Sequence, residues 1–159
     1  MCKTLEAGHS RHRIVHHKDS TGKAIVDKLI EVVLTHPNVT VCDNALVYSI
    51  QRVFGGFYIN ILKDDESFCY GTNYCILATG GIGRVYKYTT NSAIATGDGI
   101  AFAYMLGAKI SHLSRVQFHP TAFAAEKDRE RFLISEAVRG EGAVLLNCDG
   151  KRFAFDYDS

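Results

Sequence analysis

Long apolar runs, proline and an excess of charge of either sign are scarce or absent in this sequence. No run reaches the roughly 18 apolar residues of a transmembrane helix, so no membrane span is predicted. The formal net charge is only +1, which gives no large single-sign field of the kind that binds nucleic acid or an anionic membrane. With two prolines, Pro37 and Pro120, no interdomain linker stands out.

The cysteines and the N-terminus argue against a secreted protein. Five cysteines, at positions 2, 42, 69, 75 and 148, are odd in number and form no C-x-x-C pair. The first residues, MCKTLEAGHSRHRIVHH, lack the apolar segment of a secretory signal. These features favour a reduced, cytoplasmic setting over a disulfide framework. The 159 residues, 47% hydrophobic and 22% charged, match one globular domain with a core.

Three segments carry helical signals. In residues 20–35 apolar side chains recur at i, i+4 and i+8, a serine or threonine can cap the start, and Pro37 prevents continuation. Residues 96–106 predict a second helix, with Gly107 following its last turn. Residues 131–139 predict a short third helix.

Short runs rich in Val, Ile, Tyr and Phe predict strands between the first two helices, including an antiparallel meander. Farther along, residues 109–118 are predicted to be extended. Residues 143–147 and 152–155 flank Cys-Asp-Gly-Lys, which is a hairpin turn signal. The fold class is therefore α/β or α+β. The predicted strands of the central region are residues 39–42, 46–53, 56–62, 67–70 and 74–78.

Two glycine clusters are the first candidate functional feature. Gly80, Gly81 and Gly83 follow a predicted strand, and bare backbone there lets an anion or a ring edge approach free N–H groups. Residues 96–99, TGDG, open a predicted helix whose N-terminus favours negative charge, and Asp98 can accept from a hydroxyl or cap the helix. The structural alternative is a turn and an N-cap. Neither cluster is the G-x-G-x-x-G dinucleotide fingerprint.

The second candidate feature is VQFHPTAF followed by RFLISEAVRGEGA. His119 precedes Pro120, which predicts extended backbone, and its imidazole can donate to a carboxylate or carry a proton near neutral pH. Glu136 and Arg139 lie three residues apart on one helical face, directly after Ser135. The alternative is again structural: His-Pro-Thr as a turn, and the acid–base pair as a surface ion pair.

In this order and spacing the segments resemble one known family. ATGGIGRVYKYTTNSAIATGDGIAFAY, QFHPTAF and LISEAVRGEGA are similar to the FAD-dependent family that holds the L-aspartate oxidases and the succinate dehydrogenase and fumarate reductase flavoproteins. The resemblance covers nearly the whole chain. Within the family, EAGHSRHRI, YKYTTN, GDGIA and Ser-Glu-Ala-Val-Arg look like the L-aspartate oxidases, since the succinate and fumarate enzymes usually carry Thr-Glu-Gly-Cys-Arg in the last place.

The resemblance implies an α/β fold: part of a doubly wound FAD-binding domain with an antiparallel meander at about residues 39–78. Residues 1–118 would belong to that domain, and residues 119–159 would begin a capping domain for the substrate. Full-length relatives are much longer. The chain lacks their N-terminal Gly-rich βαβ unit and a downstream arginine, so we expect it to be a truncated internal segment, inactive by itself.

The implied activity is oxidation of L-aspartate to iminoaspartate by non-covalently bound FAD, which O2 or fumarate reoxidises. Iminoaspartate then passes to quinolinate synthase, so this is the first step of de novo NAD biosynthesis. No nucleic acid or membrane partner is implied. The alternatives are a fumarate reductase or succinate dehydrogenase relative, or a non-catalytic remnant.

Substrate and proton-transfer residues are also implied by the resemblance. Glu6 would face the amino group of the substrate, although Ala7 beside it replaces a usual glycine. Glu136 and Arg139 match the proton-relay pair of the fumarate-reducing relatives. The remaining substrate ligands would be imidazole and hydroxyl donors to a dicarboxylate, namely His119, Thr121 and Ser135.

Cofactor contacts are implied at two places. Asn44 and Ala45 match a main-chain contact to the adenine side of FAD. Gly80, Gly81 and Asp98 match contacts on the flavin side. No metal is expected, because no second ligand group with zinc-like spacing follows the histidines near the N-terminus, which are His9, His12, His16 and His17.

Overall fold

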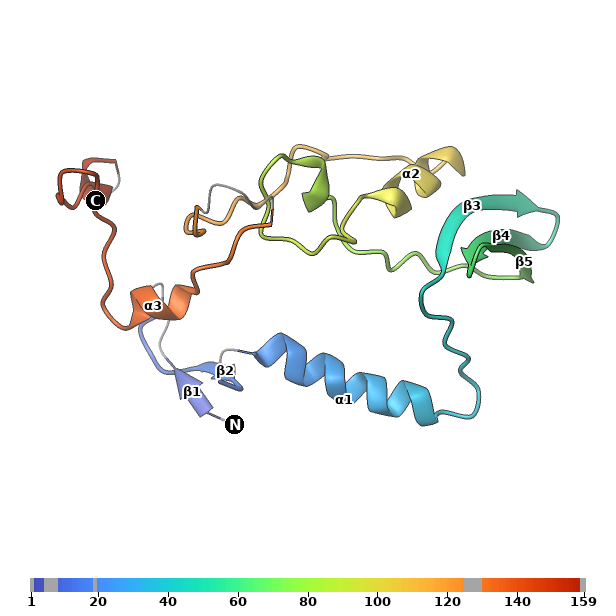
Figure 1. The fold of residues 1–159 in the computed structure, drawn as a ribbon, viewed down its shortest axis with the longest axis horizontal. Coiled ribbons are helices and arrows are strands. Elements are labelled where there is room, and N and C mark those ends of the chain that lie inside the picture. The colour runs from blue at the N-terminus through green and yellow to red at the C-terminus, as the bar shows by residue number, and fades with distance from the viewer. Residues whose placement is uncertain (1, 5–8, 19, 125–129, 158–159) are drawn as a thin grey trace. The chain divides into compact units, whose positions relative to one another are not determined.

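The computed structural model describes residues 2–4, 9–18, 20–124 and 130–157 (Figure 1). The chain divides into two compact units. The first unit comprises Met1–Thr40 and Ile134–Ser159, and the second unit comprises Val41–Leu133. Both combine helices with antiparallel strands, which is consistent with the predicted α/β class.

The first unit begins with a hairpin that the sequence did not predict. Strand β1 (Cys2–Thr4) pairs antiparallel with β2 (Ile14–His16), so that Lys3 lies opposite Val15. Each strand has only three residues, and the histidines and arginines around β2 hide the apolar alternation by which strands are recognised.

The predicted first helix is confirmed as α1 (Thr21–Thr35). Ser20 occupies the N-cap position without a side-chain capping bond, whereas the hydroxyl of Thr21 accepts from the backbone N–H of His17 at 3.0 Å. The helix ends at Thr35, and its C-cap residue, His36, directly precedes Pro37. None of its residues is buried, and its apolar stripe is open to solvent within this unit.

The predicted third helix is wrong over residues 131–135. Helix α3 (Glu136–Gly140) is shorter because the backbone before it is used in other bonds. The N–H of Arg131 donates to Thr89 O at 2.7 Å, and Phe132 O accepts from Phe123 N at 2.9 Å. Ser135 then has an extended ψ of 144° and forms the N-cap, with its hydroxyl accepting from the N–H of a residue in the first turn at 3.2 Å.

The C-terminal hairpin prediction is confirmed only as a turn. Asn147 Oδ1 accepts from the N–H groups of Asp149 and Lys151 at 3.0 and 2.9 Å. The flanking segments form no strands, only a single bridge between Leu146 and Arg152. Residues Ala154–Asp156 form a short 3-10 helix, η2.

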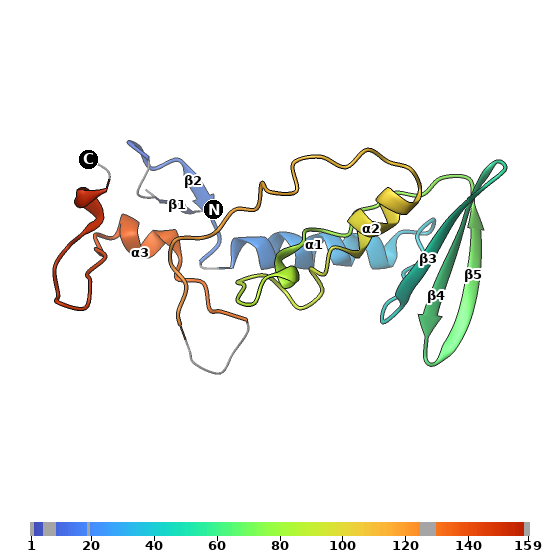
Figure 2. The same cartoon turned by 90° about the horizontal axis from the view of Figure 1, so that it is seen from above.

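The second unit contains the predicted meander. Strands β3 (Leu46–Val53), β4 (Gly56–Lys63) and β5 (Glu66–Thr72) lie in sequence order in one antiparallel sheet, seen side by side in Figure 2. The β4–β5 turn is Asp64-Asp65, both with positive φ, which matches the twist of a tight hairpin. Ile50 and Ile61 are buried on the sheet.

The strands predicted at residues 39–42 and 74–78 are wrong, and residues 109–118 also form no strand. Val41 is 50% exposed and Ile76 is 90% exposed. A strand needs a partner for its backbone N–H and C=O groups, and no strand in the described part of the chain pairs with these runs. The meander therefore spans Leu46–Thr72 rather than about 39–78.

After the meander come a short 3-10 helix, η1 (Gly83–Val85), and helix α2 (Asp98–Met105). The second predicted helix is thus confirmed, and Gly107 follows it with a φ of +87° as a C-terminal glycine should. Phe102 of α2 and Ala95 before it are buried. Over the described residues, no helix has the length and apolarity to cross a bilayer.

Candidate functional site

A cavity of about 420 Å³ in the second unit joins the two candidate features of the sequence. Gly81 and Gly83 from the first glycine cluster line it, and so does His119 from the His-Pro-Thr segment. Two motifs that are separate in sequence therefore share one cavity. The other lining residues are Ile82, Tyr86, Tyr88, Thr89, Thr90, Asn91, Arg115, Val116, Gln117, Phe118, Ala122 and Arg131.

The glycines of the first cluster differ in what surrounds them, and only Gly83 is required by close approach. A Cβ on Gly83 would lie 2.6 Å from Asn91 Cβ and 3.0 Å from Thr89 Oγ1, closer than real atoms approach. Gly80 has a φ of +73° and open space where a side chain would stand. The backbone beside Gly80 is therefore accessible to another molecule, whereas Gly83 lets the loop pack tightly on itself.

The second glycine cluster packs on the first. A Cβ on Gly99 would lie 1.9 Å from Thr79 Oγ1, so only glycine lets the start of α2 approach the loop that leads to Gly80. Gly97, with a φ of +85°, lies against Ile82. Asp98 is exposed at the first turn of α2 and accepts from the hydroxyl of Thr96 at 2.7 Å.

His119 is oriented by the backbone two residues along the chain. Its Nδ1 lies 3.2 Å from Thr121 N and 3.0 Å from Thr121 O. In one tautomer Nδ1 accepts from the N–H, and in the other it donates to the carbonyl. Either way Nδ1 is engaged, so a ligand in the cavity would be met by Nε2. Thr121 itself is 8% exposed and acts on this ring rather than lining the cavity.

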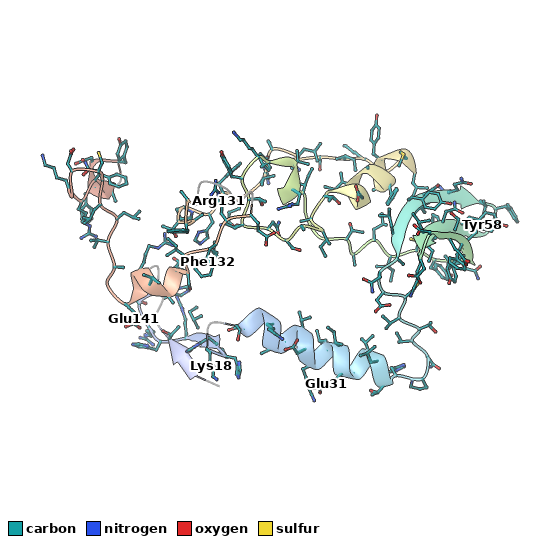
Figure 3. All side chains as sticks on the ribbon, viewed as in Figure 1. Lys18, Glu31, Tyr58, Arg131, Phe132 and Glu141 are labelled. Carbon is teal, nitrogen blue, oxygen red and sulfur yellow. The ribbon has the colours of Figure 1, made fainter. Side chains whose placement is uncertain are left out.

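Aromatic and cationic side chains that the sequence analysis missed complete the cavity wall. The rings of Tyr86 and Phe118 meet edge to face, with centroids 5.0 Å apart. The guanidinium carbon of Arg131 lies 4.4 Å from the ring centroid of Tyr88. Figure 3 labels Arg131 on the segment that runs toward α3. The alternation of basic and aromatic residues in RVYKY was the signal available in the sequence.

A second cavity, of about 540 Å³, lies in the first unit and contains Ser135. Its other lining residues are Thr4, His16, Lys18, Thr21, Gly22, Ala137 and Glu141, of which Figure 3 labels Lys18 and Glu141. The Ser135 hydroxyl is already used to cap α3. The predicted substrate hydroxyl thus belongs to the first unit, and His119 to the second.

The predicted Glu136–Arg139 pair forms as expected from its spacing. Arg139 Nη2 lies 3.4 Å from Glu136 Oε1, with side-chain exposures of 25% and 44%. A partly exposed pair at i, i+3 contributes little to stability. Its presence therefore agrees with both the proton-relay and the surface-pair interpretations.

The predicted adenine contact lies in a bend before β3. Asn44 has a φ of +50°, and Ala45 next to it is half-buried. Lys63 Nζ lies 3.4 Å from Asp43 Oδ1 and ties this bend to β4. Glu6, the predicted contact to the substrate amino group, lies outside the described residues. Within the described ranges, no group of three or more His, Cys, Asp or Glu side chains is placed to hold a metal ion.

The family comparison indicates which cofactor this chain is built to bind. Residues 3–159 match the model of the FAD binding domain, and the chain belongs to this family of flavoproteins. FAD is the cofactor that this membership indicates. The open backbone at Gly80 and Gly81 fits the flat ring of this cofactor, since the nearest atom to a Cβ on Gly81 would be Asn91 Nδ2 at 4.0 Å.

Several L-aspartate oxidases are among the relatives that match. The chain is 43% identical to that of Nostoc sp., over 97% of the chain and 27% of the relative. It is 46% identical to that of Synechocystis sp., over 97% of the chain and 28% of the relative. It is 44% identical to that of Clostridium perfringens, over 94% of the chain and 35% of the relative. The chain therefore spans only about a third of the length of these relatives or less.

Proposed function

We propose that this chain is the part of a FAD-dependent L-aspartate oxidase at which the flavin ring and the substrate meet. The observation that carries the proposal is the 420 Å³ cavity lined by both Gly81 and His119. One of these residues offers open backbone to a planar cofactor, and the other offers an imidazole to a carboxylate. The identity to L-aspartate oxidases over nearly the whole chain supports the choice of substrate.

Bound FAD would supply the redox chemistry by accepting a hydride from the α-carbon of L-aspartate, giving iminoaspartate. The residues of this chain would hold the cofactor and orient the substrate. Gly80 and Gly81 would hold the flavin through backbone N–H groups, and Asp98 would contribute a contact to the flavin as well. Asn44 and Ala45 would contact the adenine part through the main chain. His119 Nε2 donates to a substrate carboxylate, because the Thr121 backbone holds Nδ1.

The other assigned residues complete the substrate site. Glu6 pairs with the substrate ammonium group, and Ser135 donates a hydroxyl to a carboxylate. Glu136 and Arg139 pass a proton along α3. Residues 119–159 begin a capping domain, and residues 1–118 belong to a doubly wound FAD domain. The physiological partners are O2 or fumarate as electron acceptor, and quinolinate synthase as consumer of the product, in the cytoplasm.

Substrate turnover tests this proposal. A full-length enzyme that contains this chain, supplied with FAD, is incubated separately with L-aspartate, D-aspartate, L-glutamate and succinate, and hydrogen peroxide is measured in air. We expect peroxide with L-aspartate alone. Oxidation of succinate without oxidation of L-aspartate would place the chain with the succinate and fumarate enzymes instead. No turnover of any substrate by a protein that holds FAD would identify a non-catalytic remnant.

A further inference from the structure

A continuous path of contacts joins two walls of the 420 Å³ cavity. One wall is the glycine loop at Gly81 and Gly83, and the other is His119. Both walls lie in the second unit, Val41–Leu133. A reaction between two bound groups depends steeply on their separation and alignment, so the residues that fix the spacing of two such walls can determine its rate.

The turn at residues 89–91 forms the part of the path that touches the glycine loop. The hydroxyl of Thr89 accepts from the backbone N–H of Asn91 at 3.0 Å, which closes the turn. The same hydroxyl oxygen would lie 3.0 Å from a Cβ on Gly83, and the Cβ of Asn91 would lie closer still, at 2.6 Å. The turn therefore packs directly on the backbone of Gly83.

Thr89 also continues the path toward His119. Its carbonyl accepts from the N–H of Arg131 at 2.7 Å, and it forms a bridge with Glu130. A second tie runs beside this one, since Arg84 Nη1 lies 3.6 Å from Glu130 Oε2. The Glu130 side chain is 56% exposed, and an exposed pair of this kind contributes little. The main connection is therefore made by Thr89.

The last part of the path runs from residue 131 to the histidine through the backbone. The N–H of Phe123 donates to the carbonyl of Phe132, which Figure 3 labels, at 2.9 Å, next to an isolated bridge between the same two segments. Two residues before Phe123, the backbone of Thr121 holds His119 Nδ1. A displacement of Thr89 is therefore transmitted to the histidine ring by directional backbone bonds.

We propose that Thr89 is a positioning residue that fixes the separation between the glycine loop and His119. This inference rests on the proposed function, in which the loop holds the flavin and His119 binds the substrate. Thr89 acts through these two walls rather than on a ligand. Its hydroxyl holds the turn against Gly83, and its carbonyl holds the segment that leads back to the histidine. Without the hydroxyl, each wall would still bind its own ligand, but the two ligands would be misaligned.

The test compares flavin reduction with ligand binding in a full-length enzyme that contains this chain. Flavin reduction by L-aspartate is followed by stopped flow without oxygen, FAD retention by gel filtration, and succinate affinity by the change that succinate causes in flavin absorbance. Thr89→Val, which replaces the hydroxyl by a methyl group, should slow flavin reduction by about tenfold or more and leave FAD retention and succinate affinity nearly unchanged. Thr89→Ser, which keeps the hydroxyl, should react at close to the original rate.

The matched control is Thr72→Val. The hydroxyl of Thr72 accepts from the N–H of Tyr74 at 3.4 Å, which is a turn of the same kind at the end of β5, and Thr72 does not line the cavity. This variant should keep the original rate. If Thr89→Val does not fold, Asn91→Ala is measured in the same way, because it keeps the turn but removes the carboxamide that lies against Gly83. A smaller but equally selective slowing is then expected.

Two results would overturn the role of Thr89 and leave the proposed function standing. One is an unchanged rate in the variant measured, and the other is a loss of FAD and succinate affinity as large as the loss of rate, which is the result of general destabilisation. No reduction of the flavin by L-aspartate in the unaltered enzyme would overturn the proposed function as well.

Discussion

His119 and Thr121 form a local arrangement in which the histidine ring is held by the backbone of the threonine. We expect His119→Ala, in a protein that holds FAD, to weaken dicarboxylate binding more than flavin binding. Loss of one charge-assisted hydrogen bond should cost about 1.5–3 kcal/mol. The measurements are kcat/KM for L-aspartate and the visible flavin absorbance. Loss of flavin with unchanged dicarboxylate affinity would show that the residue serves the cofactor.

Gly99 is the residue where contact between the two glycine clusters is closest. A Cβ there would lie 1.9 Å from Thr79 Oγ1, so Gly99→Ala should destabilise the second unit by about 1–3 kcal/mol through overpacking. Thr79→Gly removes the clashing atoms, so the same alanine substitution should cost much less in that background. Chemical denaturation of the four proteins measures the coupling. Equal costs in both backgrounds would mean that the clusters are not in contact.

Gly22 is the matched control for this substitution. It lies in α1, a Cβ there would meet nothing within 4 Å, and its φ is not positive. Gly22→Ala should therefore stabilise the chain, by up to about 1 kcal/mol, through helix propensity. A destabilising effect of both alanines would mean that the cost at Gly99 does not come from its close approach to Thr79.

At this scale, the sequence predicted individual residues better than the contacts between them. His119 and Gly81 were predicted and do line one cavity. Arg131 and Tyr88 were missed, because a cation stacked on a ring across a long stretch of chain leaves no local spacing pattern. The roles assigned to all of the predicted site residues stay predictions, namely those of Glu6, Asn44, Ala45, Gly80, Gly81, Asp98, His119, Thr121, Ser135, Glu136 and Arg139.

Among the elements, the meander β3–β5 is the one whose core is easiest to test. Ile61 on β4 is 5% exposed, so Ile61→Ala should lower the free energy of unfolding by about 2–4 kcal/mol. Leu46 on β3 is 57% exposed, and Leu46→Ala should cost much less. Hydrogen exchange of the β3–β5 amides measures both effects. Similar exchange in the two variants would contradict the burial pattern of the sheet.

The accuracy of the element predictions follows the range of the interactions that form each element. Helix α1 and the meander were predicted because a helix and tight hairpins are specified by neighbouring residues. Residues 39–42 and 74–78 have the composition of strands, but a strand forms only beside a partner. The helix predicted from residue 131 was shortened by backbone bonds to Phe123 and to Thr89, the second of which is far away in sequence.

For the molecule as a whole, the sequence offers proposed flavin contacts without a G-x-G-x-x-G loop. That loop at a helix N-terminus is the usual site of the dinucleotide pyrophosphate. We therefore expect the 159-residue chain, expressed by itself and mixed with excess FAD, to lose the flavin on gel filtration. A full-length L-aspartate oxidase treated in the same way is the control. A stoichiometric yellow complex of the 159 residues that makes peroxide from L-aspartate would contradict this expectation.

The central claim is that flavin and substrate meet in the cavity shared by Gly81 and His119. A crystal structure of the protein with FAD and succinate tests it most directly. We predict that the flavin ring lies along the Gly80-Gly81 backbone and that a succinate carboxylate lies within hydrogen-bonding distance of His119 Nε2. Succinate bound elsewhere, with His119 Nε2 facing solvent or the flavin away from these glycines, would contradict the account.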